Sequence, residues 1–196
     1  MIRMRVSGVV FSALVISGGV MTARAQSSQP AAPAKAAVAP ATANANATIL
    51  DIMSTMIVPA SKVVFEAVST ETVAGKERQK EPRTDAEWAA VNAAALKIIE
   101  GSKLLTVDGR AVARNMNAKP KEGELGHKEI AALLAKRRPE WNEFAKALSE
   151  VASAAAKAAQ KKDKDGVFNA AGDMDMACEN CHLAFWYPDQ EKLFKK

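Results

Sequence analysis

The sequence predicts an all-α protein, and three observations support that fold class. Apolar residues recur at intervals of three and four in four long segments, which is the spacing that places them on one face of a helix. Several of these segments open with helix-start signals. No stretch alternates apolar and polar residues over any length, as a half-buried strand would. Four such helices bury their apolar stripes by packing together, so we expect an antiparallel, up-down four-helix bundle.

The first predicted helix covers about residues 48–69, where Ile, Met, Val and Ala recur at helical spacing. Pro59 lies inside this pattern. A proline has no N–H to donate to the carbonyl four residues earlier, which here belongs to Thr55. We therefore expect a kink at Pro59, or a break of the helix into two pieces.

The second predicted helix covers about residues 85–102. Thr84 and Glu87 have the spacing of a capping box, in which each side chain accepts a hydrogen bond from the backbone of the other residue. Gly101 lies near the expected end, where glycine is typical of a helix stop.

The third and fourth predicted helices cover about residues 139–161 and 164–186. Pro139 would occupy the first turn of the third helix, where proline is tolerated, and Asp163 is a candidate cap for the fourth. A shorter helix is predicted at residues 127–136.

Two of the predicted connections between helices differ in composition and length. Residues 76–83 form a mixed run of charges, which we interpret as a solvated loop. Residues 103–126 are long for a connection in a helical bundle, and that length suggests a functional role.

The N-terminal part of the chain predicts export. Residues 1–25 resemble a secretory signal peptide, with Arg3 and Arg5 in the basic segment and an apolar segment at 6–20. The sequence Ala-Arg-Ala at 23–25 fits the cleavage rule, so we expect a mature chain that starts at Gln26. An uncleaved membrane anchor is the alternative, but the apolar run is short for a span. Residues 26–47 read as an Ala/Pro-rich linker, and residues 48–196 as the folded domain.

The motif that carries chemistry is Cys178-Glu179-Asn180-Cys181-His182, which is typical of covalent haem c attachment. In this chemistry each thiol adds across one vinyl group of the porphyrin. Two intervening residues in a helical turn bring both sulfurs to the same haem edge, and His182 would be the proximal iron ligand. The chain has two cysteines in all, and both lie in this motif. One haem is therefore the predicted cofactor.

Other interpretations of the motif are a redox or structural disulfide and half of a zinc site. A thioredoxin-like motif is expected near a βαβ pattern, which the sequence lacks. A zinc site would need a further ligand from His127 or a carboxylate. Export supports the haem interpretation, since bacterial haem attachment takes place outside the cytoplasm, in an oxidising compartment. We therefore expect a periplasmic protein.

Charge gives no indication of nucleic-acid binding. The formal net charge is +5, but three of these charges belong to Arg3, Arg5 and Arg24 of the predicted leader, which holds no acid. Cleavage would leave +2. The basic isoelectric point is thus largely a property of the leader, and we expect neither a nucleic-acid partner nor, after cleavage, a membrane partner.

An up-down topology predicts what surrounds the iron. The end of the fourth helix, with His182, would lie at the same end as the start of the first helix and the 103–126 connection. Met53 and Met56 lie three residues apart on the first helix, and such residues share a face. Met53 is the first choice for a distal thioether ligand and Met56 the second, although Met residues commonly fill cores. His127 is a further possible distal ligand, with an exposed polar role as the alternative.

With these residues in view, the chain resembles the class II c-type cytochromes, the cytochrome c-prime group and its low-spin members related to cytochrome c-556. The resemblance covers about residues 48–187. It rests on the late Cys178–His182 motif, on Phe185 three residues after it, and on the segment Ile-Met-Ser-Thr-Met-Ile-Val-Pro-Ala at 52–60. The chain departs from the family at 185–187, where many members have Tyr or Phe followed by Arg. Arg110 and Arg114 become candidates for holding the propionates, with surface solvation as the alternative.

The resemblance implies an exported haem bundle. Low-spin members carry a Met ligand in the first helix, whereas high-spin members lack a sixth ligand and bind small gases. The first expectation is a periplasmic one-electron carrier, rather than an enzyme, with His182 proximal, Met53 distal and redox proteins as partners. The alternative is a five-coordinate protein that binds gases such as nitric oxide, and a weaker one is a haem-free bundle with Cys178 and Cys181 as a redox pair. Relatives often dimerise, so a homodimer is left open.

Overall fold

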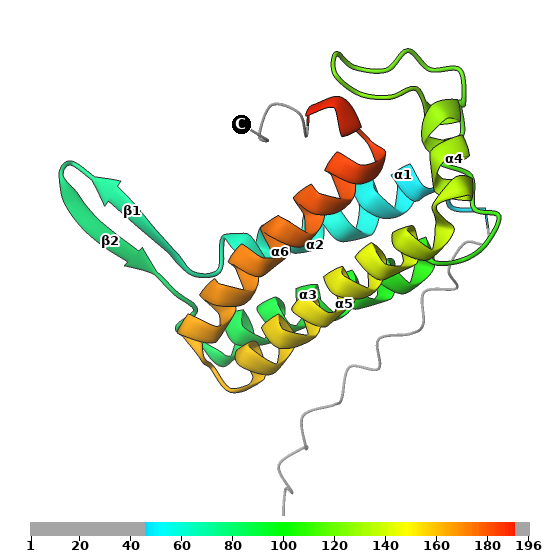
Figure 1. Cartoon of the computed structure of the whole chain (residues 1–196). Coiled ribbons are helices and arrows are strands. Elements are labelled where there is room, and N and C mark those ends of the chain that lie inside the picture. Colours follow the sequence, from blue (N-terminus) through cyan, green and yellow to red (C-terminus); the bar gives the residue numbers. More distant parts are fainter. Residues whose placement is uncertain (1–45, 191–196) are drawn as a thin grey trace, which may run out of the picture. The chain divides into compact units, whose positions relative to one another are not determined.

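The computed structural model describes residues 46–190, which fold mostly as helices with one small two-stranded sheet (Figure 1). The prediction of a mainly helical fold is thus confirmed. The predicted leader at 1–25 and all but the last two residues of the predicted linker at 26–47 lie outside the described residues. Within the described part, no helix is both long and apolar enough to cross a membrane.

The first helical run consists of three pieces: α1 (Ile49–Ile52), the π-helical segment η1 (Met53–Ile57) and α2 (Val58–Phe65). Thr48 caps the start, because its hydroxyl accepts a hydrogen bond from the Asp51 N–H (3.1 Å) and its own N–H donates to the Asp51 carboxylate (2.9 Å). The expected kink or break at Pro59 takes the form of η1, in which the Val58 N–H donates to the carbonyl five residues earlier. The chain therefore stays helical through the proline.

The prediction of an all-α fold is wrong between α2 and α3. Strands β1 (Ser69–Val73) and β2 (Lys76–Lys80) pair as an antiparallel hairpin that extends away from the helices in Figure 1. The hairpin turns at Ala74 and Gly75, which have φ of 51° and 75°. Two consecutive positive φ angles match the twist of a two-residue hairpin. All residues of β2 are exposed, so the charge run is solvated as predicted, but in a strand.

Helix α3 (Asp85–Leu105) begins as predicted and ends later. Thr84 and Glu87 form the expected capping box, with the Thr84 N–H donating to the Glu87 carboxylate at 2.8 Å. Gly101 is no stop signal. It is buried inside the helix, and a Cβ at this position would lie 2.8 Å from Cγ1 of Ile57. The glycine is explained by the close approach of η1 to α3.

The remaining helices agree closely with the prediction: α4 (His127–Lys136), α5 (Arg138–Gln160) and α6 (Lys164–Phe185), followed by the 3₁₀ turn η2 (Pro188–Gln190). The Asp163 carboxylate caps α6 by accepting from the Gly166 N–H at 2.9 Å. Because caps are local signals, the sequence predicts these boundaries well.

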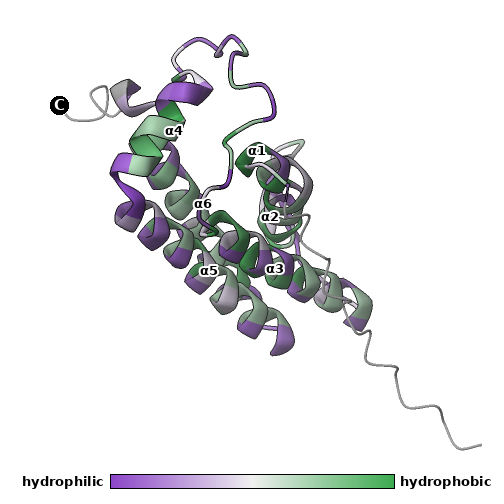
Figure 2. Cartoon of the chain, turned by 90° about the vertical axis from the view of Figure 1, so that its right-hand side faces the viewer, coloured by the Kyte–Doolittle hydropathy of each residue, from purple (hydrophilic) through white to green (hydrophobic). Residues whose placement is uncertain are grey.

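The core lies between the helices of the described domain. Helix α5 packs against α3 and α6, and α2 packs against the same two helices. Along α3 and α5, green and purple regions alternate in Figure 2, as expected of helices with one buried and one exposed face. A smaller apolar cluster near the α5–α6 turn contains Trp88 of α3. The larger cluster extends to the other end of α6, where it borders a cavity.

Candidate functional site

A cavity of about 430 Å³ lies beside the C-terminal half of α6. This volume is within the range of small-molecule sites in proteins. Most of its wall is apolar and comes from α1, η1, α2, α5 and α6, including Leu50, Ile57, Val58, Phe65, Phe144 and Leu148. The polar and charged groups on the wall are few, so a bound molecule would be held largely in an apolar environment.

Cys178, Cys181 and His182 all line this cavity. They lie within one and a quarter turns of α6, and residues three and four apart share a helix face. The structure therefore brings the three predicted site residues together, with both thiols and the imidazole at one wall. The two cysteines are free and form no disulfide with each other.

Burial sets the protonation of these three side chains. It raises the pKa of the Cys178 thiol to about 11, with a further contribution from the charges of Asp175 and Glu179. Burial also raises the pKa of Cys181 to about 12. The pKa of His182 is lowered by burial, against the opposing effect of Glu179 and Glu124. At neutral pH the site thus holds two neutral thiols and a neutral imidazole, whose free nitrogen lone pair can bind a metal.

Met53 lines the same cavity from η1, whereas Met56 does not. Met56 is half-buried and packs against the core. The expectation that both side chains share one face assumed an α-helix. In η1 the hydrogen bonds join residues five apart, so each residue turns the chain by less than in an α-helix and residues three apart diverge. The structure therefore separates the first choice of distal ligand from the second.

Aromatic side chains close the cavity around His182. Trp186 and Tyr187 line it, and their rings lie 6.4 Å and 5.9 Å from the His182 ring. The Tyr187 hydroxyl donates to the Glu179 carboxylate at 2.9 Å. Trp141 lines the cavity from α5, and its indole N–H donates to the Leu105 carbonyl at 2.8 Å. The Tyr187 hydrogen bond ties the chain after α6 back to that helix, and the Trp141 hydrogen bond ties α5 to α3.

Phe185 lies behind this wall, where it is fully buried. Its ring meets those of Trp141 and Phe144 edge-on, at 5.3 Å and 6.1 Å between centroids. The guanidinium of Arg137 lies 5.0 Å from the centre of the Phe185 ring. The aromatic residue noted in the sequence after the motif is thus a core residue that anchors the end of α6.

The long connection lies at the cavity end of the domain, as the sequence predicts. Leu125 donates its N–H to the Trp186 carbonyl at 2.8 Å. At the start of α1, the Ile49 and Leu50 N–H groups donate to the carbonyls of residues 111 and 112 at 2.9 Å and 3.0 Å. Lys121 and Glu124 of this connection line the cavity. Sequence reasoning missed both, because no motif marks them and only the tertiary fold brings them there.

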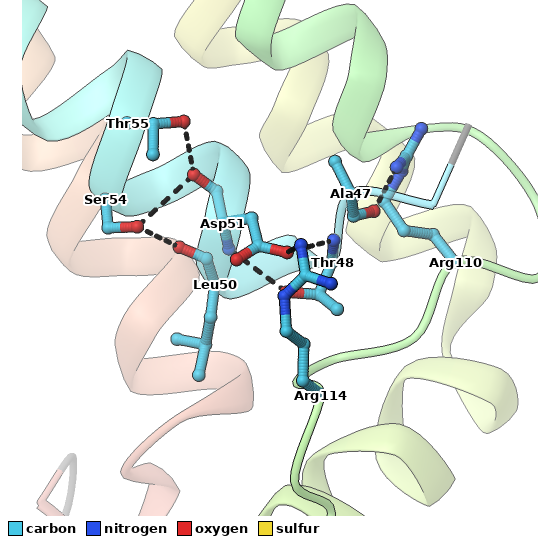
Figure 3. Close-up of polar contacts among 8 residues, drawn as sticks. All are labelled: Ala47, Thr48, Leu50, Asp51, Ser54, Thr55, Arg110 and Arg114. Carbon is cyan, nitrogen blue, oxygen red and sulfur yellow. Dashed lines mark hydrogen bonds and ion pairs between the residues drawn. The ribbon is translucent and has the colours of Figure 1, made fainter. Parts of the chain in front are cut away.

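Arg110 and Arg114 support the start of α1 (Figure 3). Neither residue lines the cavity. Arg110 donates from Nε to the Leu104 carbonyl at 3.0 Å and from a terminal nitrogen to the Ala47 carbonyl. Arg114 pairs with the Asp51 carboxylate at 3.0 Å. These contacts give both residues a structural role at the start of the first helix.

His127 is also outside the cavity wall, with Nδ1 2.9 Å from the Asn115 carbonyl. Among residues 46–190, no three His, Cys, Asp or Glu side chains cluster closely enough to hold a metal ion by themselves. In the comparisons with known proteins, no family model, no curated protein and no solved structure matches this chain.

Proposed function

We propose that this chain is a periplasmic c-type haem protein that carries single electrons, with one haem covalently attached at Cys178 and Cys181. The observation that carries the proposal is the convergence of the two thiols, the His182 imidazole and the Met53 thioether on one apolar cavity. This is the donor set of a His/Met cytochrome. The motif alone supports haem attachment, and the cavity adds a place for the porphyrin.

The proposal includes a fold, which is an up-down four-helix bundle of the class II cytochrome type. Its helices would be the run from α1 to α2, then α3, α5 and α6. Two observations support it: these four pack in a closed ring of neighbours, and α5 joins α6 through a short turn at 161–163. The hairpin and α4 would then be additions to the two other connections.

The chain's own groups suit attachment. In thioether formation a thiol S–H adds across a vinyl double bond, so that a C–S bond forms and the hydrogen goes to the other vinyl carbon, with no leaving group. Cys178 and Cys181 are three residues apart on α6 and both line the cavity, so their sulfurs can meet one porphyrin edge. The neutral His182 imidazole can bind iron from the same helix turn.

A haem bound here would supply a ferric–ferrous couple. Met53 would contribute a soft, neutral thioether, which favours the ferrous state. The apolar side chains of α2 and α5 would exclude water and limit rearrangement between the two states. We assign no enzymatic activity. If Met53 does not bind the iron, the same apolar wall would leave an open position for a small gas, which is the alternative function.

The proposal is tested by intact mass and absorption spectroscopy. The full chain is produced in a bacterium that attaches haem c, and the periplasmic fraction is analysed. We expect the mass of residues 26–196 plus one haem, colour that persists in denaturing gels, and a low-spin spectrum that changes little with carbon monoxide. A bare polypeptide mass would contradict haem attachment. A high-spin haem that binds carbon monoxide readily would instead assign the gas-binding function.

A further inference from the structure

A surface groove follows α2 and α6 away from the cavity. Near the hairpin it is a hollow bordered by Val68 and Phe168, and these two residues also border the next hollow along α6. That second hollow shares Phe65 and Asp175 with the wall of the cavity that holds Cys178 and Cys181. The three depressions therefore form one line from the hairpin base to the candidate site, along elements that run beside each other in Figure 1.

The floor of the groove is apolar and open. Phe65, Val68, Phe168, Ala171 and Gly172 contribute to it. Phe168, in the second turn of α6, is 57% exposed. A Cβ at Gly172 would meet nothing within 4 Å, so nothing covers the floor there. One turn further along α6, Met176 is 64% exposed.

The central part of the groove's rim is acidic. Asp173 and Asp175 are exposed and are the charged residues of the groove's central hollow in the described structure. Glu179 follows one turn later and is also exposed. The hollow next to the hairpin has charges of both signs, with Lys80 and Lys164 among its lining residues, but from residue 165 to residue 185 α6 contains no Lys or Arg. The carboxylates therefore produce a negative potential over the part of the groove nearest the cavity.

We propose that the groove between α2 and α6 is the docking surface for a redox protein that presents lysines around an apolar centre. This inference rests on the proposed function, because docking would serve electron transfer. It adds the chemistry of the partner. Lysines of such a partner would face Asp173, Asp175 and Glu179, while its apolar centre would cover Phe168 and Met176. Interfaces commonly combine an apolar centre with a charged rim.

Charge complementarity and position favour this occupant. An acidic rim attracts a basic protein and raises its association rate. An anionic membrane surface would be repelled by the same carboxylates. Because Asp175 and Phe65 border both the groove and the cavity, a partner seated here would lie next to Cys178 and Cys181. Docking at this face would therefore bring its redox centre close to the site.

The experiment measures binding of a probe protein to the haem-loaded chain by calorimetry and by amide chemical shifts. The probe is a small monohaem cytochrome with a lysine-rich face. Its lysine-acetylated form, which lacks those charges, is the matched control. Binding is measured at about 10 mM and about 200 mM ionic strength, where the Debye length is about 30 Å and about 7 Å. The variants are Asp173→Asn/Asp175→Asn and Phe168→Ala, with Glu143→Gln/Glu150→Gln on α5 as the charge control.

We expect the probe to bind at low salt, to weaken strongly at high salt, and to shift amide signals of α2 and α6. The double Asn variant should weaken binding by roughly fivefold to tenfold, Phe168→Ala should weaken it too, and the α5 control should bind as the unaltered chain does. Equal binding of the acetylated probe, equal binding by the double Asn variant, or no binding at low salt would overturn the proposal. Self-association that Phe168→Ala abolishes would assign the groove to a second copy instead. Haem content is measured separately and tests the proposed function. Failure of the docking proposal can therefore be told apart from failure of the proposed function.

Discussion

Gly101 of α3 lies directly against Ile57 of η1, so closely that a Cβ on the glycine would come within 2.8 Å of the isoleucine Cγ1. Ile57 is only 3% exposed, so relief of this contact requires its side chain to change rotamer or η1 to shift relative to α3. We expect Gly101→Ala to destabilise the protein by up to about 2 kcal/mol, because overpacking costs about 1–3 kcal/mol and helix propensity returns about 1 kcal/mol. Chemical denaturation of both proteins measures this difference.

Gly172→Ala is the matched control for that substitution. Gly172 also lies inside a helix, but a Cβ there would have no neighbour within 4 Å. This change should stabilise the protein by about 0.5–1 kcal/mol. In the background of Ile57→Ala, the cost of Gly101→Ala should fall, because the contact is gone. If both glycine substitutions stabilise equally, the close packing of η1 on α3 is wrong.

Met53→Ala and Met56→Ala should affect the proposed haem differently. Met53 lines the cavity and Met56 packs against the core. Loss of the Met53 thioether should turn a low-spin haem high-spin and let carbon monoxide bind, whereas Met56→Ala should leave the spectrum unchanged and lower stability. Absorption spectra with and without carbon monoxide measure both effects. A change of spin state in the Met56 variant alone would mean that the distal ligand is a thioether, but that Met56 supplies it and Met53 does not.

The thiols of a haem-free chain should react slowly with alkylating reagents. A raised pKa means less thiolate at a given pH, and the thiolate is the reactive form. For Cys178 the pKa rises from 9.0 to about 11, so near pH 8 its thiolate fraction should fall about a hundredfold. Reaction with iodoacetamide, followed by mass spectrometry in native buffer and in denaturant, measures the protection. Equal rates in both conditions would favour the redox-pair interpretation, provided that circular dichroism shows a folded chain.

Lys121 and Arg114 offer a matched pair of charge removals. Lys121 lines the cavity, whereas Arg114 pairs with Asp51 at the start of α1. Removal of a positive charge near the iron favours the ferric state, so Lys121→Gln should lower the reduction potential. Arg114→Gln should leave the potential unchanged. A spectroelectrochemical titration of both variants measures this, and a larger shift for Arg114→Gln would contradict the placement of the 103–126 connection.

Local signals explain which parts of the fold the sequence predicts. The capping box of Thr84 and Glu87 and the cap at Asp163 depend on residues three apart, so they mark the starts of α3 and α6 correctly. The hairpin was missed because β2 is polar and exposed on both faces, so that its residues lack the alternation on which strand prediction depends. A signal existed in the turn, where Ala74 and Gly75 separate a threonine-rich segment from a charge-rich one.

The residues of the candidate site also divide into those that the sequence predicts and those that it does not. Cys178, Cys181 and His182 follow from one short motif, and Met53 follows from that motif combined with the expected topology. Lys121, Glu124 and Tyr187 come from segments with no pattern of their own, and only tertiary packing brings them to the cavity. Gly101 was misinterpreted because its role depends on Ile57, which is distant in sequence and close in space.

The π-helical segment η1 also makes the direction of Met53 depend on the length of the first helical run. A π turn holds one residue more than an α turn between its hydrogen-bonded groups. Ser54 and Thr55 lie within η1, are both exposed, and donate hydroxyl hydrogen bonds to the preceding turn. Deletion of one of them would restore a plain α-helix and rotate everything before it by about 100°. The aim of Met53 at the cavity thus depends on the length of the helix as much as on the identity of the residue.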